Sequence, residues 1–324
     1  MKISIIIPYL NDFSVLMMVL PHLLREVPAG EGEIIIIDNG SFDSLYLPPD
    51  PRIRIIRNRR NIGVGGAFNQ GVEKSRAEYI VLMGCDVIPQ RGWWKRILET
   101  LDDNTNTIFN CVSSGFNDKS KPFSGKSVKR YGAHVLFKVT KQDLPSHSPL
   151  QEDPKFSKIL QAKWNYLPTT EEFSEVRCLL GAFYWMHKSD YVKLRGWNLH
   201  KMWGSLEGML SIKARAHGMK LIVDRGLEAA HYYGRAIDRP TRMDLQYYNM
   251  LLIAHTMFSD ALRDELVAYL RYGDREEKIE KLNVNQARVM IKRNSGAIQL
   301  ERDYNNRHFV HGLIKNWDNF EKNH

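Results

Sequence analysis

The chain has 324 residues, of which 43% are hydrophobic and 26% charged, and its formal net charge is +9. This composition is typical of a folded soluble protein of one large domain, with or without an appendage. No apolar run is long enough to span a membrane, and the N-terminus lacks the basic flank and cleavage site of a signal peptide. Three cysteines without a CxxC pair argue against a disulfide framework or a zinc cluster, so we expect a reducing, cytoplasmic environment.

Strand and helix patterns alternate through the first part of the chain. The β-branched runs that indicate buried strands are 2–10, 33–38, 52–57 and 79–84, and the runs with helical spacing are 13–27 and 65–77. This alternation predicts an α/β fold with a mainly parallel central sheet, whose ligands bind at the carboxyl ends of the strands. Asp38 and Asp86 both lie at such ends, which marks them as candidate site residues.

The second half of the chain has a different pattern. Residues 113–170 are rich in Lys, Ser, Pro and Asn, and they predict loops with an edge strand at 133–139. A helix at 202–218 and a strand at 220–224 follow, and from Asp244 the pattern is helical to the end. We therefore expect a main domain over residues 1–240 and a helical C-terminal extension over 241–324.

The positive charge is concentrated in two segments. Residues 52–60 hold five arginines, and residues 115–141 hold seven basic residues against a single acid, Asp118. Such segments are compatible with a plain solvated surface, or with attraction of a phosphorylated ligand, an anionic membrane surface or a nucleic acid. Charge alone does not choose between these interpretations.

The glycine-rich stretch "GVGGAF" at 63–68 allows a dinucleotide-binding interpretation. It follows a strand, opens a helix and precedes Asp86 by about twenty residues, as in that fingerprint. However, Phe68 occupies the third glycine position, and two further strands already precede the loop. The glycine pattern alone is therefore weak support for dinucleotide binding.

The order of several motifs is more specific. The stretches "SIIIPYLND", "EIIIIDNGSFDS", "NRRNIGVGGAFNQGVEKSRAEYIVLMGCDVIP" and "LEGMLSIKARAHGMKLIVD" resemble, in sequence and spacing, family 2-type glycosyltransferases with the GT-A fold. "CLLGAFYWM", "WGSLE" and "AAHYYGR" are similar to the acceptor half of polypeptide N-acetylgalactosaminyltransferases and β-galactosyltransferases. The resemblance covers roughly residues 2–112 and 176–235. It implies a GT-A fold and transfer of a sugar from a nucleotide-sugar, with a UDP-sugar expected, to a hydroxyl acceptor.

The resemblance also implies a donor site. Asp38 and Asn39 would hold the nucleotide base, although Asx residues followed by glycine also simply favour a turn. The remaining residues expected at the donor are Pro8, Tyr9, Asn61, Gly63, Gly65 and Gly66. The proline and tyrosine would flank the base, and the glycines would allow close backbone approach to the nucleotide.

A metal site is implied next. Asp86 stands at the last position of the family's DxD motif, which here reads Gly84-Cys85-Asp86 and lacks the first acid. His231 matches the family's distal histidine. Together they would hold Mn²⁺ or Mg²⁺ against the diphosphate, and a histidine ligand favours Mn²⁺.

Two further residues would contact the acceptor. Glu207 occupies the general-base position of inverting relatives, although Leu206 replaces the first acid of their "ED" pair. Trp203 offers a flat face on which a sugar can stack, and core packing is its ordinary alternative. We therefore expect an inverting reaction, while the similarity to N-acetylgalactosaminyltransferases keeps a retaining reaction open.

The acceptor and the oligomeric state stay open. A lipid-linked glycan at a membrane surface, a protein side chain, and a hydroxymethylated DNA base of the kind glycosylated in phage systems are all compatible with the sequence. The missing acids before Asp86 and Glu207 also allow a different class: a non-catalytic nucleotide-sugar or nucleic-acid binding protein that has kept the fold.

Overall fold

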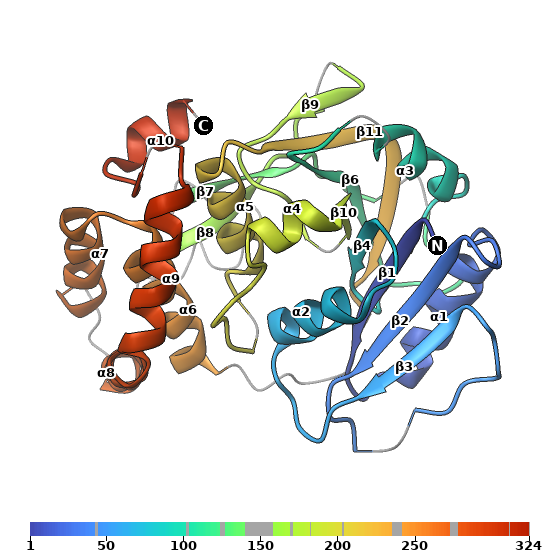
Figure 1. Ribbon diagram of the computed structural model, residues 1–324, viewed down its shortest axis with the longest axis horizontal. Coiled ribbons are helices and arrows are strands. Elements are labelled where there is room, and N and C mark those ends of the chain that lie inside the picture. Colours follow the sequence, from blue (N-terminus) through green and yellow to red (C-terminus); the bar gives the residue numbers. More distant parts are fainter. Residues whose placement is uncertain are drawn as a thin grey trace.

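The computed structural model describes residues 1–42, 45–101, 104–123, 127–139, 158–168, 171–181, 183–202, 204–234, 242–272, 278–310 and 312–323 (Figure 1). The strands are β1 Ile3–Tyr9, β2 Gly32–Asp38, β3 Ile53–Arg57, β4 Tyr79–Met83, β5 Val87–Pro89, β6 Thr107–Phe116, β7 Ala133–Val139, β8 Lys158–Trp164, β9 Phe173–Glu175, β10 Phe183–His187 and β11 Lys220–Tyr232. The helices are α1 Phe13–Leu24, α2 Val64–Lys74, α3 Trp93–Leu101, α4 Lys188–Lys193, α5 Leu206–Ala216, α6 Met243–Met257, α7 Asp260–Tyr272, α8 Lys278–Arg293, α9 Ser295–His308 and α10 Trp317–Asn323.

The central sheet confirms the predicted fold class. Its strand order is β3-β2-β1-β4-β10-β6-β11-β5, and β9 also pairs with β11. Strands β1 to β4 are mutually parallel, as the alternation of strands and helices predicts. Antiparallel β10 lies between β4 and β6, and β11 runs parallel to β6. The carboxyl ends of β1, β2 and β4 therefore share one edge.

The β-branched runs are explained by burial on both faces of the sheet. Alternate side chains of β1 enter different cores: Ile3, Ile5 and Ile7 pack with α1 and α3, while Ile6 packs with α2 on the opposite face. Because both faces are covered, the strand has no polar alternation, which is the pattern expected of buried parallel strands.

The structure corrects the predicted loop between 113 and 170. Strand β6 continues to Phe116, and β7 pairs with β8 in a separate antiparallel hairpin, so more strand is present than one edge strand. The prediction was wrong at 113–116 because Ser113 and Ser114 are polar yet buried in the central sheet. Strand β11 is also longer than the predicted 220–224, since it resumes after an irregularity between Asp224 and Glu228.

The C-terminal helices extend one core of the sheet domain. Helices α6 to α9 share the hydrophobic cluster that covers the α2 face of the sheet. A fully buried ion pair, Lys213 Nζ to Glu301 Oε1 at 2.9 Å, joins α5 to α9. We propose that the main domain ends near residue 240 and that the C-terminal helices form an extension packed on it. Of the helices in the described ranges, none is long and apolar enough to cross a membrane.

Candidate active site

Asp86 and His231 come together where β4 ends. The turn after β4 carries Asp86, whose carbonyl accepts a hydrogen bond from the Tyr232 amide at 2.8 Å. This backbone contact aligns the end of β11 with the turn. The side chains then meet, with His231 Nε2 3.2 Å from Asp86 Oδ2. Two residues 145 positions apart in the sequence thus form one polar pair.

The surroundings of His231 leave one ring nitrogen unused. Its ring meets the Tyr233 ring edge-on at 4.4 Å between centroids. Within the described part of the chain, Nδ1 is buried and has no hydrogen-bond partner, while Nε2 faces Asp86. The histidine is therefore held by packing and by the sheet.

The donor atoms of this pair suit a divalent cation. Neighbouring ligands of an octahedral ion with bonds of about 2.1 Å lie roughly 3.0 Å apart, close to the 3.2 Å between His231 Nε2 and Asp86 Oδ2. No group of three or more His, Cys, Asp or Glu side chains suited to a metal occurs among the described residues. The pair thus fits an ion whose other ligands come from phosphate oxygens and water.

Glu207 lies near the same centre, in the first turn of α5. Burial raises the pKa of its carboxyl group, and the charge of His231 partly opposes that rise. A side chain at Gly181 would collide with the Glu207 carboxyl and crowd the Tyr184 hydroxyl, so Gly181 leaves the space that this carboxyl occupies. A buried carboxyl with a raised pKa near a polar Asp–His pair is typical of an active site.

Tyr233 interacts electrostatically with both Asp86 and Glu207. Burial raises the pKa of its hydroxyl, Arg130 lowers it, and Asp86 and Glu207 raise it further. The Arg130 guanidinium lies 5.6 Å from the centre of the Tyr233 ring. Sequence reasoning placed Arg130 only within a basic segment and did not single it out, because nothing in its local sequence shows that it reaches Tyr233, which follows β11.

The predicted base-binding residue Asp38 is already bonded within the protein. Its side chain is buried, and one oxygen accepts the Ser41 amide at 3.0 Å while the other pairs with Arg57 Nη1 at 2.8 Å. The Asn39 amide donates to the Tyr9 carbonyl at 2.8 Å, joining the ends of β1 and β2. Pro8 is partly exposed and Tyr9 is buried at this edge.

Asn39 and Asn61 organise the loop before α2. Asn39 Oδ1 accepts the Ile62 amide at 3.0 Å and an Asn58 N–H at 3.2 Å. Asn39 Nδ2 donates to Asn61 Oδ1 at 2.9 Å and to the Gly63 carbonyl at 3.2 Å. Asn61 Oδ1 also accepts the Gly63 amide at 2.8 Å. These side chains thus position the loop at the strand ends.

Protein neighbours explain two of the predicted glycines. Gly63 has a φ of 84°, and a side chain there would collide with the Met202 backbone. A Cβ at Gly65 would lie 2.7 Å from Trp197, whereas Gly66 has only the looser contact with Ile62. Gly63 and Gly65 therefore allow the segment after α4 to pack closely against this loop. Of the three glycines, Gly66 has the most room beside it.

Some expectations lie outside the described residues. Trp203, the predicted acceptor platform, is one of them, and so are parts of the basic segment 115–141. Trp203 is retained as a proposal from the sequence resemblance alone.

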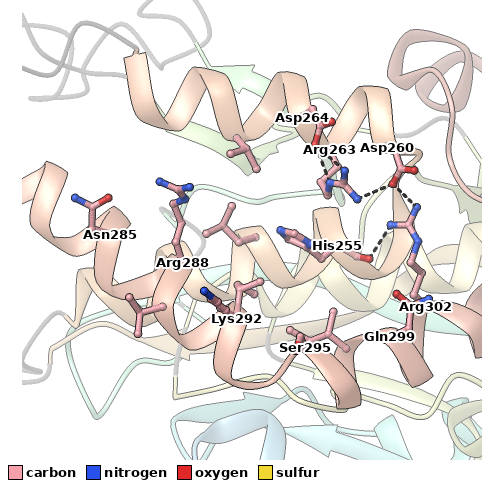
Figure 2. A pocket seen from close by; sticks show the side chains of 15 residues that line it. His255, Asp260, Arg263, Asp264, Asn285, Arg288, Lys292, Ser295, Gln299 and Arg302 are labelled. Carbon is pink, nitrogen blue, oxygen red and sulfur yellow. Dashed lines mark hydrogen bonds and ion pairs between the residues drawn. The ribbon is translucent and has the colours of Figure 1, made fainter.

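A cavity of about 960 Å³ lies elsewhere, among the C-terminal helices α6 to α9 (Figure 2). Asp260 bridges Arg263 and Arg302 on one side of it, and Arg288 and Lys292 project from α8 on the other. None of the predicted site residues lines this cavity. The cluster formed by Asp86, His231 and Glu207 is therefore the better candidate for the chemistry.

Comparisons with known proteins bear on the family and the fold. Residues 4–156 match the sequence model of glycosyl transferase family 2. The putative glycosyltransferase EpsH of Bacillus subtilis is 27% identical over 114 residues, covering 33% of each chain. The glycosyltransferase GlyG of Streptococcus pneumoniae is 28% identical over 105 residues, covering 31% of this chain and 33% of GlyG. The chain thus matches about a third of the length of these relatives.

Solved structures show the same fold. GalNAc-T7, crystallised with UDP, GalNAc and Mn²⁺, superposes with a TM-score of 0.63 at 13% identity, covering 92% of this chain and 58% of that one. A Staphylococcus aureus TarS fragment in complex with UDP-GlcNAc gives a TM-score of 0.51 at 14% identity, covering 94% and 88%. The predicted resemblance is confirmed: residues 4–156 match the model of glycosyl transferase family 2, and the fold is the GT-A fold of these glycosyltransferase structures.

Proposed function

We propose that this protein transfers a sugar from a nucleotide-sugar, with a UDP-sugar preferred, to a hydroxyl group of an acceptor. The observation that carries the proposal is the 3.2 Å contact between Asp86 and His231, with Glu207 close enough for the charge of His231 to affect its pKa. The family 2 match and the GT-A fold agree with it.

Asp86 and His231 would hold a divalent cation, with Mn²⁺ favoured by the histidine. When bound, the cation stabilises the negative charge that develops on the leaving diphosphate. Asp38, Asn39 and the loop that ends at Gly63 would form the nucleoside side of the site. Because Asp38 is already paired with Arg57, we expect it to act mainly by fixing the edge against which the base lies.

Glu207 would act as the general base. The acceptor hydroxyl oxygen attacks the anomeric carbon as the carbon–oxygen bond to the diphosphate breaks, and the bonding electrons leave with the nucleoside diphosphate. The acceptor proton passes to Glu207. A base with a raised pKa is a stronger proton acceptor near neutral pH than an ordinary carboxylate. A direct displacement of this kind inverts the anomeric configuration.

A panel of nucleotide-sugars tests the proposal. Each is incubated with the protein and Mn²⁺ without acceptor, and nucleotide release is measured. We expect slow, Mn²⁺-dependent hydrolysis of one UDP-sugar, lost in Asp86→Ala and in His231→Ala but retained in Glu73→Gln, which alters an exposed carboxylate. Tight binding of UDP without any turnover would instead support the non-catalytic alternative.

A further inference from the structure

The five arginines of segment 52–60 fall into two groups in the structure. Arg59 and Arg60 are exposed and form no ion pair in the described ranges of the chain. The other three pair with acidic side chains at distances between 2.6 and 2.8 Å: Arg52 with Asp50, Arg54 with Glu33, and Arg57 with Asp38. Most of the basic segment thus stabilises the sheet edge, and two of its charges remain available to a partner.

The two unpaired arginines follow β3 at the carboxyl edge of the sheet. Tyr9 of β1 is the register partner of Asp38 of β2, which in turn is the partner of Arg57 of β3. The loops that follow these three strands therefore lie side by side. In the sheet order, β1 and β2 separate β3 from β4, the strand before Asp86, so the two arginines lie away from the expected position of the diphosphate.

Hydrogen bonds and close packing join the three loops into one surface. The Asn11 amide donates to Ser41 Oγ at 3.1 Å, and the Phe42 amide donates to Asn11 Oδ1 at 2.8 Å. A Cβ at Gly40 would lie only 2.6 Å from the carbonyl carbon of Arg60. The loop after β2 is therefore in contact with the loops on both of its sides.

Apolar side chains are exposed on this surface. Phe42 is 91% exposed, Phe13 at the start of α1 is 50% exposed, and Leu10 is 38% exposed. Isolated exposed apolar residues are ordinary, but a group of them on adjoining loops marks a surface that a partner covers. Together with the two unpaired arginines they form a surface that we call the outer rim: Leu10, Phe13, Phe42, Arg59 and Arg60.

The acidic residues of the three loops do not offset the charge of the outer rim. Asp12 is buried, and Asp50 is already paired with Arg52. Asp43 lies outside the described residues, and its single charge is smaller than that of the two rim arginines. The outer rim therefore carries a positive charge.

Cations flank the apolar side chains of the outer rim. Lys119 Nζ donates to Ser14 Oγ at 3.5 Å, next to Phe13, while Arg60 packs against the turn before Phe42. Aromatic and aliphatic side chains that enter the headgroup region, with basic residues around them that attract anionic headgroups, are the pattern by which proteins bind the surface of a bilayer. A nucleic acid would account for the cations but offers no apolar environment for the exposed leucine.

We propose that the outer rim docks on the surface of an anionic phospholipid bilayer. Phe13 and Phe42 enter the headgroup region, and Arg59 and Arg60 contact lipid phosphates. When docked, the protein has the carboxyl ends of β1, β2 and β3 facing the bilayer. The inference goes beyond the proposed sugar transfer and does not depend on it.

Vesicle co-sedimentation of the full chain tests the inference. Vesicles of phosphatidylcholine and phosphatidylglycerol in equal parts are compared with vesicles of phosphatidylcholine alone, and we expect binding only to the anionic ones, weakened by salt. Each basic residue at an anionic surface contributes about fivefold in affinity, so Arg59→Gln/Arg60→Gln should weaken binding roughly 25-fold. Phe42→Ala should weaken it roughly tenfold, because an inserted apolar side chain is lost.

Matched control variants lie on the C-terminal helices, at the other end of the molecule (Figure 1). Arg293→Gln/Arg307→Gln removes two exposed arginines, and Leu300→Ala removes an apolar side chain that is 68% exposed. Both should bind anionic vesicles nearly as tightly as the unaltered protein. The inference is overturned if the controls weaken binding as much as the rim variants, or if the unaltered protein does not bind anionic vesicles. Thermal unfolding checks that each variant is folded.

A fluorescent label shows whether Phe42 enters the bilayer. The three cysteines of the chain are buried, so Phe42→Cys can be labelled at the new thiol with a fluorophore whose emission shifts in an apolar medium. We expect anionic vesicles to shift this emission to shorter wavelength, and to leave that of labelled Leu300→Cys unchanged. Vesicle binding with no shift at position 42, or with equal shifts at both positions, would contradict docking through the outer rim.

Two other partners would give different results. If the outer rim binds a second copy of this chain, sedimentation velocity detects a dimer that Phe42→Ala dissociates, and anionic vesicles are not bound. If it binds a nucleic acid, Arg59→Gln/Arg60→Gln weakens binding of a single-stranded oligonucleotide, again without vesicle binding. Either result overturns the inference and leaves the proposed function intact, since nucleotide-sugar turnover tests that function separately.

Discussion

The sheet edge around Asp38 and Asn39 and the region around His231 and Glu207 differ in how their polar groups are hydrogen-bonded. Around Asp38 and Asn39, side-chain oxygen and nitrogen atoms bond to other parts of the protein. Around His231, Glu207 and Arg130, side-chain nitrogen atoms lack hydrogen-bond partners within the described part of the chain, and burial raises the pKa of the Glu207 carboxyl. Satisfied groups fix a shape, whereas unsatisfied or perturbed groups are available for ligands and chemistry. The first region is therefore expected to be a rigid support and the second the reactive part.

The largest effect should come from Glu207→Gln. General-base assistance is typically worth roughly 10²–10⁴-fold, so sugar transfer should fall by that factor, as measured by product formation, while UDP affinity is unchanged. In the unaltered protein, transfer should decline as the pH falls through the raised pKa of Glu207, since the protonated carboxyl cannot accept a proton. Transfer by the variant at near-normal rates, with retained anomeric configuration, would replace the inverting mechanism with a retaining one.

The sequence predicts the N-terminal half of the fold well and the reactive cluster only in part. Strands β1 and β2 are predictable because both of their faces are buried, which leaves a continuous apolar run. Family spacing singles out Asp86 and His231, whose side chains meet in the structure. Arg130 was missed because its contacts with Trp164 and Tyr233 join three separate segments, and no local pattern records them. Likewise, the glycine pattern does not show that Gly63 packs against Met202.

A smaller effect is expected from Gly181→Ala. The added methyl group would overlap the Glu207 carboxyl and move it. A misplacement of about 1 Å in a catalytic group can cost on the order of 10²-fold, so transfer should fall by about that factor while UDP affinity stays the same. Gly296→Ala adds a methyl group with no heavy atom within 4 Å and serves as the control. Unchanged transfer in Gly181→Ala would mean that the position of Glu207 is not critical.

On the rigid side, Asn39→Ala should reduce stability. It removes the acceptor of the Ile62 amide and the donor to Asn61, in a buried setting. Leaving such groups unpaired costs about 1–3 kcal/mol, which denaturant unfolding can measure. UDP affinity should fall with it, because the loop that ends at Gly63 loses its anchor. Full stability with lost UDP binding would show instead that Asn39 contacts the nucleotide directly.

The smallest effect concerns the stability of Glu207→Gln. Burial raises the pKa of Glu207 in the folded state above its unfolded value, so the folded state binds the proton more tightly. This contribution to stability is present at low pH and is lost as the pH rises through the folded pKa. The variant, which carries no such charge, should therefore gain stability relative to the unaltered protein above that pKa. Unfolding curves at pH 5 and pH 8 check the sign, and an equal difference at both would contradict it.

The most direct test of the central claim is an electron paramagnetic resonance titration of Mn²⁺ into the protein with saturating UDP. The account predicts one tight Mn²⁺ site in the unaltered protein, lost in both Asp86→Ala and His231→Ala, and unchanged in Asp38→Asn. Retention of tight UDP-dependent Mn²⁺ binding in His231→Ala would contradict the Asp86–His231 site on which the proposed chemistry depends.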